Sequence, residues 1–191
     1  MKITKHSWKR ETFMLFLDVL VILLIVAWLF GFRINTTPSI PEGIYQISLG
    51  DFGRGELVGF CLDSENPFSQ LAEEREYLGS GSCPSRLQPL IKNLVGLPGD
   101  DLRITDEGLI LNGDFLQGTA LANHDSQGRP MPPSLLNEGI IPDGLCLVLS
   151  QQHIGSFDSR YFGLVPLESL RKVIPIAVFG QDWPEIPLST N

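Results

Sequence analysis

The residue with the clearest capacity for chemistry in this sequence is Lys92. Residues 33–191 contain two lysines, Lys92 and Lys172, and eight arginines. The distinction matters because a desolvated lysine can lose its proton near neutral pH, whereas arginine stays charged. Lys92 lies in PLIKNLVGLPGD, where strand alternation places it on one face with Leu90 and Leu94. On an apolar face the pKa of an amine falls, which suits a general base.

Two structural roles for Lys92 remain open from its surroundings alone. Its stem can lie along an apolar edge strand while the ammonium reaches water, or a carboxylate can hold it. Lys92 taken by itself favours these roles over catalysis. Lys172, in LRKVIP, is interpreted as an ordinary surface charge.

Ser39 is the candidate nucleophile, in NTTPSIPEGIY between Pro38 and Pro41. The two prolines fix the backbone φ locally and disfavour helix, so a stiff extended loop presents the hydroxyl. Stiffness suits a nucleophile, although a plain linker has the same composition. Thr37 lies two residues earlier, where its hydroxyl and the Ser39 amide can form an oxyanion hole.

A third polar group lies in GSFDSRYFGLVP, residues 155–166, which places Ser156, Asp158 and Arg160 within five positions. The Ser156 hydroxyl can hydrogen-bond a neutral amine and orient its lone pair. Asp158 and Arg160, two residues apart, more often form a structural ion pair than a catalytic one. We expect neither a metal nor a cofactor.

Two other interpretations compete with a Ser–Lys pair. A Ser–His–Asp triad of Ser39, His153 and Asp158 has the required residue types. However, His124 and His153 are the only histidines in residues 33–191, and both lie in polar, loop-like contexts. A non-catalytic β module that is tethered to the membrane and binds an assembly partner would leave Ser39 and Lys92 unexplained.

An apolar segment, residues 13–32, precedes these groups and carries one charge, Asp18. A helix of 20 residues at about 1.5 Å per residue spans the hydrocarbon core of a bilayer. Residues 1–11 have a net charge of +3 and residues 33–191 a net charge of −10. The positive-inside rule therefore predicts residues 1–12 in the cytoplasm and residues 33–191 outside. A cleaved signal peptide is disfavoured, because the run is long and no A-x-A-like site follows it.

Composition excludes several classes of protein and bears on the cysteines. The net charge of −8 over 191 residues argues against nucleic-acid binding, and 43% hydrophobic residues argue against disorder. Outside the cytoplasm disulfides persist, and Cys61 and Cys83 flank an apparent insertion, residues 61–88. We expect these two to pair and Cys146, in LCLVL, to be a core thiol; three free thiols are the alternative.

The remaining pattern predicts a mainly β domain of antiparallel strands. Asn112-Gly113 favours a tight hairpin turn, and Pro175 restricts its strand to an edge or a bulge. A helix is predicted over 67–78, with Asn66 as N-cap, and a long surface loop over 117–144. The predicted strands are 44–47, 56–62, 89–97, 101–105, 109–112, 145–149 and 172–180.

These motifs carry a resemblance to a known family. T-P-S-I-P-E-G-I-Y, K-N-L-V-G-L-P-G-D and F-D-S-R-Y-F-G-L-V-P resemble, in order and rough spacing, the membrane-bound type I signal peptidases (family S26), Ser–Lys dyad proteases with a β-rich catalytic domain. The N-x-T-x-S start, the Cys61–Cys83 insertion with A-x-x-R-x-Y-L, and S-F-D-S-R-Y-F-G resemble more closely the conjugative-transfer, TraF-type branch. The matched motifs lie in about 35–45, 61–100 and 150–166.

The resemblance implies a role for each candidate residue. Ser39 matches the nucleophile and Lys92 the general base, while Thr37 matches the hydroxyl of the oxyanion hole. Ser156 matches the hydroxyl that orients the lysine, and Asp158 and Arg160 match a supporting ion pair. One departure is that many housekeeping relatives carry Gly-Asp-Asn where this chain has residues 151–153, Gln-Gln-His.

The resemblance also implies a substrate and a location. The expected substrate is a membrane-inserted precursor protein, in the TraF-type branch a conjugative pilin precursor, and the expected partners are the lipid bilayer and a conjugation or secretion machinery. A housekeeping signal peptidase is the alternative. Residues 33–191 would then form a periplasmic serine peptidase domain, anchored in the bacterial inner membrane by residues 13–32. Whether the product is hydrolysed or cyclised stays open.

Overall fold

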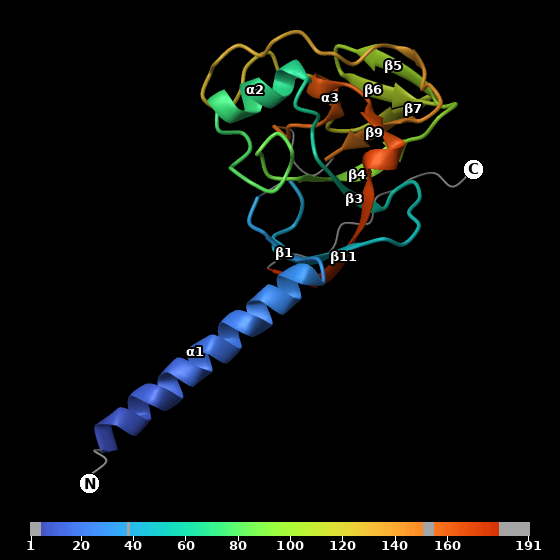
Figure 1. The fold of residues 1–191 in the computed structure, drawn as a ribbon. Coiled ribbons are helices and arrows are strands. Elements are labelled where there is room, and N and C mark those ends of the chain that lie inside the picture. Colours follow the sequence, from blue (N-terminus) through green and yellow to red (C-terminus); the bar gives the residue numbers. More distant parts are fainter. Residues whose placement is uncertain (1–4, 38, 151–154, 180–191) are drawn as a thin grey trace.

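A computed structural model describes residues 5–37, 39–150 and 155–179. One long helix, α1 (Lys5–Leu29), projects from a β-rich body (Figure 1). The body contains, in chain order, β1 (Phe32–Asn35), β2 (Gly43–Ser48), β3 (Leu57–Phe60), α2 (Pro67–Glu74), β4 (Leu90–Gly96), β5 (Asp101–Thr105), β6 (Gly108–Leu111), β7 (Asp114–Leu116), β8 (Gly139–Ile140), β9 (Leu145–Leu149), α3 (Ser159–Phe162), β10 (Val165–Pro166), the 3₁₀ turn η1 (Leu167–Ser169) and β11 (Arg171–Val178).

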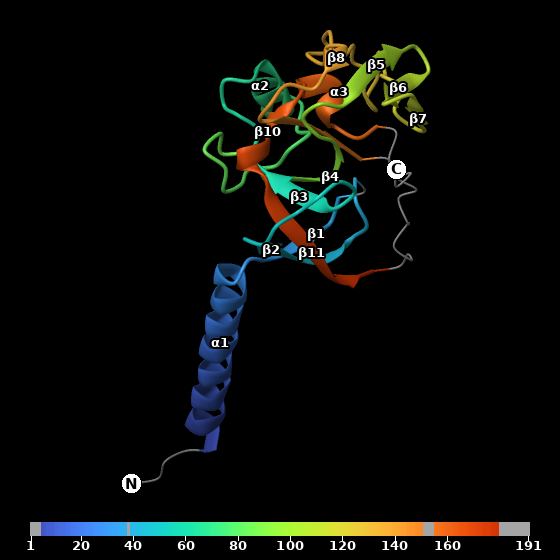
Figure 2. The same cartoon turned by 90° about the vertical axis from the view of Figure 1, so that its right-hand side faces the viewer.

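The strands of the described residues form two antiparallel sheets. The larger sheet has the order β1-β2-β11-β3-β4-β9-β10, and the smaller one the order β7-β6-β5-β8. The strands β1, β2 and β11 lie at the end of the body next to α1, and the smaller sheet lies at the opposite end (Figure 2). The predicted mainly β, antiparallel class with one N-terminal apolar helix is therefore confirmed.

Local patterns predicted most strands correctly. Each of the seven predicted runs overlaps a strand of the structure. Asn112 and Gly113 have φ of 53° and 91° in the turn between β6 and β7, because this tight hairpin needs positive φ. Of the two positions predicted for Pro175, the structure has the bulge: the β11–β2 register shifts between Pro175 and Ala177, and β11 lies inside the sheet.

Some boundaries differ from the predictions. The helix α2 ends at Glu74 rather than at residue 78, because Glu76 has a φ of 57° and the Tyr77 N–H closes back onto Ala72 O at 2.9 Å. The strand β8 lies within the predicted loop 117–144 and pairs with β5. Such short strands carry no pattern of their own.

The predicted membrane segment 13–32 also differs at its end, since α1 stops at Leu29 and β1 begins at Phe32. Gly31 makes this change of direction with a φ of 85°. Its carbonyl accepts a hydrogen bond from Ile47 N at 3.0 Å. Within α1, residues 10–29 have a mean hydropathy of 2.7 and form a helix long and apolar enough to cross a membrane.

The strands β4 and β9 contribute to two hydrophobic cores. On one side, Leu90 and Leu94 pack with side chains of β3, α2 and α3. On the other side, Val95 and Leu149 pack with Leu102 and other side chains of the smaller sheet. Successive residues of a strand point to opposite faces, so both strands are covered on both sides. This double coverage buries whatever β4 carries at its centre.

We expect Gly31→Ala to destabilise the body. An added Cβ would lie 2.5 Å from Ile47 O, and the φ of 85° disfavours any L side chain. A side chain in this backbone region costs about 1–3 kcal/mol. Denaturant unfolding of the full chain in detergent micelles measures the loss. Gly53→Ala is the matched control, because nothing lies within 4 Å of its added Cβ; equal stability of the two variants would contradict the prediction.

Candidate active site

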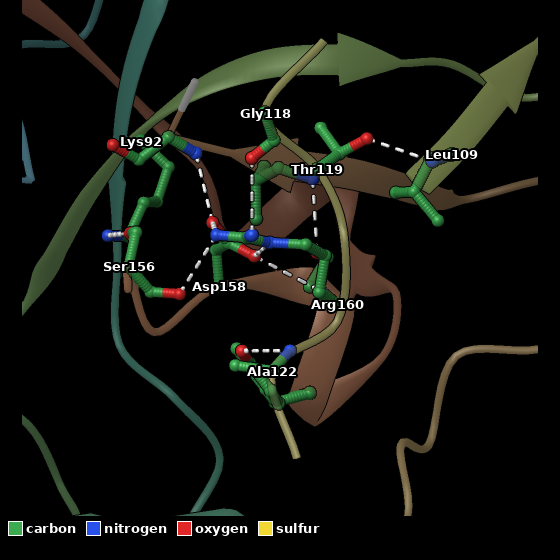
Figure 3. Close-up of polar contacts among 12 residues, drawn as sticks. Lys92, Leu109, Gly118, Thr119, Ala122, Ser156, Asp158 and Arg160 are labelled. Carbon is green, nitrogen blue, oxygen red and sulfur yellow. Dashed lines mark hydrogen bonds and ion pairs between the residues drawn. The ribbon is translucent and has the colours of Figure 1, made fainter. Parts of the chain in front are cut away.

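Lys92 lies at the centre of β4 and is 1% exposed. It pairs with Val58 of β3 and shares a face with Leu90 and Leu94, as alternation predicts. Its Nζ donates a hydrogen bond to Ser156 Oγ at 2.7 Å (Figure 3). Because β4 lies between β3 and β9 and the amine is buried, the edge-strand alternative with an amine in water is wrong.

The surroundings of Lys92 favour its neutral form. Burial lowers its pKa from 10.5 to about 8, while the negative charge of Asp158 raises the pKa and the positive charge of Arg160 lowers it. An amine with a pKa of about 8 can accept a proton near neutral pH. Burial therefore shifts the pKa of Lys92 in the direction that a general base near neutral pH requires.

Asp158 organises the turn that carries Ser156. It is the N-cap of α3, where Oδ1 accepts from Arg160 N at 3.2 Å. Its other oxygen accepts from Ser150 N at 3.1 Å and from Arg160 Nη2 at 2.9 Å. This carboxylate thus joins the end of β9 to the Ser156 turn.

Arg160 is fully buried and completes the ion pair. Its Nε lies 2.8 Å from Asp158 Oδ1. Its other donors reach Ser156 O at 3.1 Å, Ala120 O at 3.1 Å and Gly118 O at 3.4 Å (Figure 3). A buried ion pair is tolerated only when its remaining polar atoms are also hydrogen-bonded, as here. Asp158 and Arg160 hold Ser156 in place, and the lysine contacts Ser156 rather than either charge.

Ser39 is half-buried in the loop between β1 and β2. Its carbonyl accepts a hydrogen bond from the Ser150 hydroxyl. Ser150 directly follows β9, and since Asn93 pairs with Leu149, the next position of this ladder sets Ser150 beside Lys92. The Ser39 loop is therefore tied next to Lys92. Among the described residues, the Lys92 amine hydrogen-bonds Ser156 and not Ser39 Oγ.

Thr37 is exposed, and its hydroxyl donates to Asn35 Oδ1 at 2.7 Å. The Asn35 amide in turn donates to Thr37 O at 2.9 Å, Ile40 O at 3.1 Å and Pro41 O at 3.2 Å. To serve an oxyanion, Thr37 would exchange Asn35 for the substrate. Pro38 lies outside the described residues, as do Gln151, Gln152 and His153.

Two residues of this site were not predicted as parts of it. Asn35 shapes the Ser39 loop, whereas the sequence had shown it only as the first residue of the N-x-T-x-S start, with no role of its own. An Asn two residues before a Thr is a spacing common in side-chain-stabilised turns. Ser150 holds the Ser39 carbonyl, and no local signal announces a contact across 111 positions. His124 is exposed in the loop 117–144 and bridges to Pro130, so it lies outside this cluster.

The cysteines have the arrangement expected from the sequence. Cys61 and Cys83 form a disulfide, and Cys146 is a buried thiol whose pKa burial raises to about 12. In the part of the chain that the structure describes, no three His, Cys, Asp or Glu side chains are grouped to hold a metal ion.

Comparison with known proteins agrees with the resemblance of the motifs. The profile of the family described as signal peptidase, peptidase S26, matches residues 7–178. The chain belongs to this signal peptidase family.

The relatives of this chain include proteins named TraF and proteins named signal peptidase I. A plasmid transfer protein TraF of Escherichia coli is 36% identical over 148 residues, 78% of this chain and 83% of that protein. A probable conjugal transfer protein TraF of Sinorhizobium fredii is 38% identical over 144 residues, 73% of each. A probable signal peptidase I-2 of Synechocystis sp. is 31% identical over 139 residues, 72% of this chain and 52% of that protein. A crystal structure of a signal peptidase I from Enterococcus faecalis aligns with 66% of this chain and 99% of its own, at 22% identity and a TM-score of 0.37.

Replacing Lys92 with Met should stabilise the chain at neutral pH. The folded-state pKa lies below the unfolded value, so the unfolded chain binds more protons between about pH 8 and 10.5, and stability rises with pH across that window. Below pH 8 the buried ammonium lowers the free energy of unfolding by the full amount, about 3 kcal/mol. Denaturant unfolding in detergent should show Lys92→Met more stable by up to this amount at pH 7, with the difference shrinking toward pH 10.5.

Lys172→Met is the matched control for that experiment. Lys172 is half-exposed and pairs with Glu56 at 2.7 Å, so its loss removes a lysine without emptying a buried site. Its unfolding should follow that of the unchanged chain. A Lys92→Met difference that stays constant from pH 7 to pH 10.5 would contradict a buried amine with a depressed pKa.

Proposed function

We propose that this chain is a membrane-anchored serine endopeptidase that removes the leader segment of exported precursor proteins, with Ser39 as nucleophile and Lys92 as general base. The observation that carries the proposal is the buried Lys92 amine, with a pKa of about 8, beside the loop that holds Ser39. Membership of the signal peptidase family supports peptide-bond cleavage as the reaction.

The chemistry begins with neutral Lys92. One N–H of the amine donates to Ser156 Oγ, which leaves the nitrogen lone pair to accept the Ser39 proton as Oγ attacks the scissile carbonyl. The Ser39 amide and the Thr37 hydroxyl stabilise the oxyanion. The leaving amine then takes the proton from the Lys92 ammonium, and an acyl-enzyme remains. Lys92 next activates the water that releases the acyl group and regenerates Ser39.

We propose that α1 crosses the bacterial inner membrane. The N-terminus then lies in the cytoplasm and residues 33–191 lie in the periplasm. The apolar window of residues 10–29 and the charge difference across it support this orientation. Ser39 follows the end of α1 by ten residues, so cleavage takes place near the periplasmic surface of the inner membrane. The substrate is a membrane-inserted precursor, bound as an extended strand with small side chains in shallow apolar pockets.

We further propose a conjugative pilin precursor as the substrate and conjugation machinery as the partner. The relatives that are named for plasmid or conjugal transfer, at 36% and 38% identity, support this choice. The relative named as a probable signal peptidase I-2, at 31% identity, supports the alternative of a general signal peptidase. A non-catalytic assembly module is a further alternative, and it requires no nucleophile.

Ser39→Ala and Lys92→Arg should each abolish precursor processing. The first variant lacks the attacking hydroxyl, and the second carries a side chain that cannot take up its proton. We expect losses of about a thousandfold or more in cleavage rate. Mass spectrometry of a pilin precursor that is co-expressed with each variant measures the outcome. Loss of the leader gives one product mass, and cyclisation gives a mass lower by one further water.

Two variants serve as controls for this experiment. Lys172→Arg changes the other lysine of residues 33–191, and His153→Ala removes the histidine that a Ser–His–Asp triad would use; both should keep processing. Processing by Ser39→Ala would leave the non-catalytic module as the better explanation. Loss of processing in His153→Ala with unchanged folding would favour the triad instead.

The pH dependence of cleavage should report Lys92. Since the neutral amine is the active form, kcat/KM should rise about tenfold per pH unit below pH 8 and level off above it. Steady-state kinetics on a fluorogenic peptide that spans the precursor cleavage site, with the full chain in detergent, gives the profile. A midpoint between pH 6 and 7 would point to a histidine base and against Lys92.

A further inference from the structure

Phe157 lies between Ser156 and Asp158 and is the centre of an aromatic group. Its ring centroid is 5.3 Å from that of Phe162 and 6.5 Å from that of Tyr161. Two further rings come from the disulfide-closed insertion 61–88: Tyr77 at 5.5 Å and Phe68 at 6.1 Å. We call these five residues the Phe157 cluster. Through it, the insertion touches the turn whose Ser156 hydroxyl accepts the Lys92 hydrogen bond.

Further contacts fix the insertion against α3 and against the loop 117–144. Asn66 caps α2 by accepting from Phe68 N at 2.9 Å, and its amide donates to Phe162 O at 3.0 Å. The Tyr77 hydroxyl donates to Asp125 Oδ2 at 2.6 Å, and Arg129 Nε lies 2.7 Å from the same oxygen. The insertion is therefore held at its helix and at the loop 117–144.

The insertion also contributes side chains to the core on the Lys92 face of β4. Its buried side chains Leu62, Phe68 and Leu87 belong to the same hydrophobic core as Leu90 and Leu94, the neighbours of Lys92 on its face. The charged groups near the amine are Asp158 and Arg160, which act in opposite directions. Burial has the largest effect on the Lys92 pKa, so a change in the packing of this core would act on the amine mainly through its exposure to water.

We propose that the insertion 61–88 acts through Phe157 as a positioning element, which holds the Ser156 hydroxyl on the Lys92 amine and keeps that amine desolvated. The inference rests on the proposed function. Phe157 is a positioning residue, because its ring packs against other aromatic rings and it acts on the amine through the turn between Ser156 and Asp158. The disulfide Cys61–Cys83 contributes by closing the insertion on itself.

The test is the pH profile of precursor cleavage by the full chain in detergent with Phe68→Ala. Phe68 is 2% exposed on α2 and is not one of the residues proposed to react, so its truncation loosens the cluster without removing a catalytic atom. Water should reach Lys92, and the midpoint of kcat/KM should rise by about one pH unit, which is roughly a tenfold loss at pH 7 and little loss at pH 10. Cys61→Ser/Cys83→Ser should shift the midpoint in the same direction.

Leu102→Ala is the matched control, because Leu102 is 1% exposed and belongs to the core between β4, β9 and the smaller sheet rather than to the core on the Lys92 face. It should lower stability and leave the midpoint unchanged. Phe68→Leu keeps most of the apolar volume and should show a smaller upward shift than Phe68→Ala. If Phe68→Ala does not fold, as judged by circular dichroism, Phe68→Leu decides.

An unchanged midpoint in the folded Phe68 variants, or an activity lower by the same factor at every pH, overturns the positioning role. That result leaves the proposed function intact if Ser39→Ala is still inactive. Processing by Ser39→Ala overturns the proposed function itself, whatever the Phe68 variants do. The two failures are therefore distinguishable.

Discussion

The burial of one amine is the constraint on which the rest of the structure depends. Lys92 can sit at 1% exposure only because β4 lies inside the sheet, between β3 and β9, and is covered by a core on each side. The neighbouring charges do not reverse the effect of burial, since Asp158 and Arg160 shift the Lys92 pKa in opposite directions. A charged pair that is nearly neutral as a unit can therefore be built next to the amine and still orient Ser156.

Local signals predicted the strands and the candidate Ser39 and Lys92, because alternation, turn residues and the flanking prolines act over a few positions. The rest depended on contacts between distant segments. The hydrogen bond from Ser150 to Ser39 spans 111 positions, and no periodicity encodes it. The same holds for Phe157, which the sequence presents as one aromatic residue among several and the fold places against the insertion. The early end of α2 escaped prediction because Glu76, not a glycine, takes the left-handed conformation.

The smaller sheet is coupled to the site as well as to the core. Arg160 donates to Ala120 O and Gly118 O in the segment that follows β7, and Thr119 between them accepts from Leu109 N of β6 at 2.8 Å (Figure 3). One guanidinium thus connects the Ser156 turn with the sheet farthest from α1. A substitution in β6 or β7 can therefore affect Lys92 through Arg160 and Ser156, although both strands belong to a different sheet from β4.

The joint between α1 and the body has a consequence for how a bond is chosen. The helix ends at Leu29, β1 begins at Phe32, and Gly31 is hydrogen-bonded to Ile47 of β2, so little slack separates helix from sheet. With α1 in a bilayer, such a short connection would fix the distance between Ser39 and the membrane surface. Under the proposed function, two substrates with the same residues around the scissile bond but at different heights would reach Ser39 unequally. Distance from the membrane would then be a part of specificity that no pocket needs to encode.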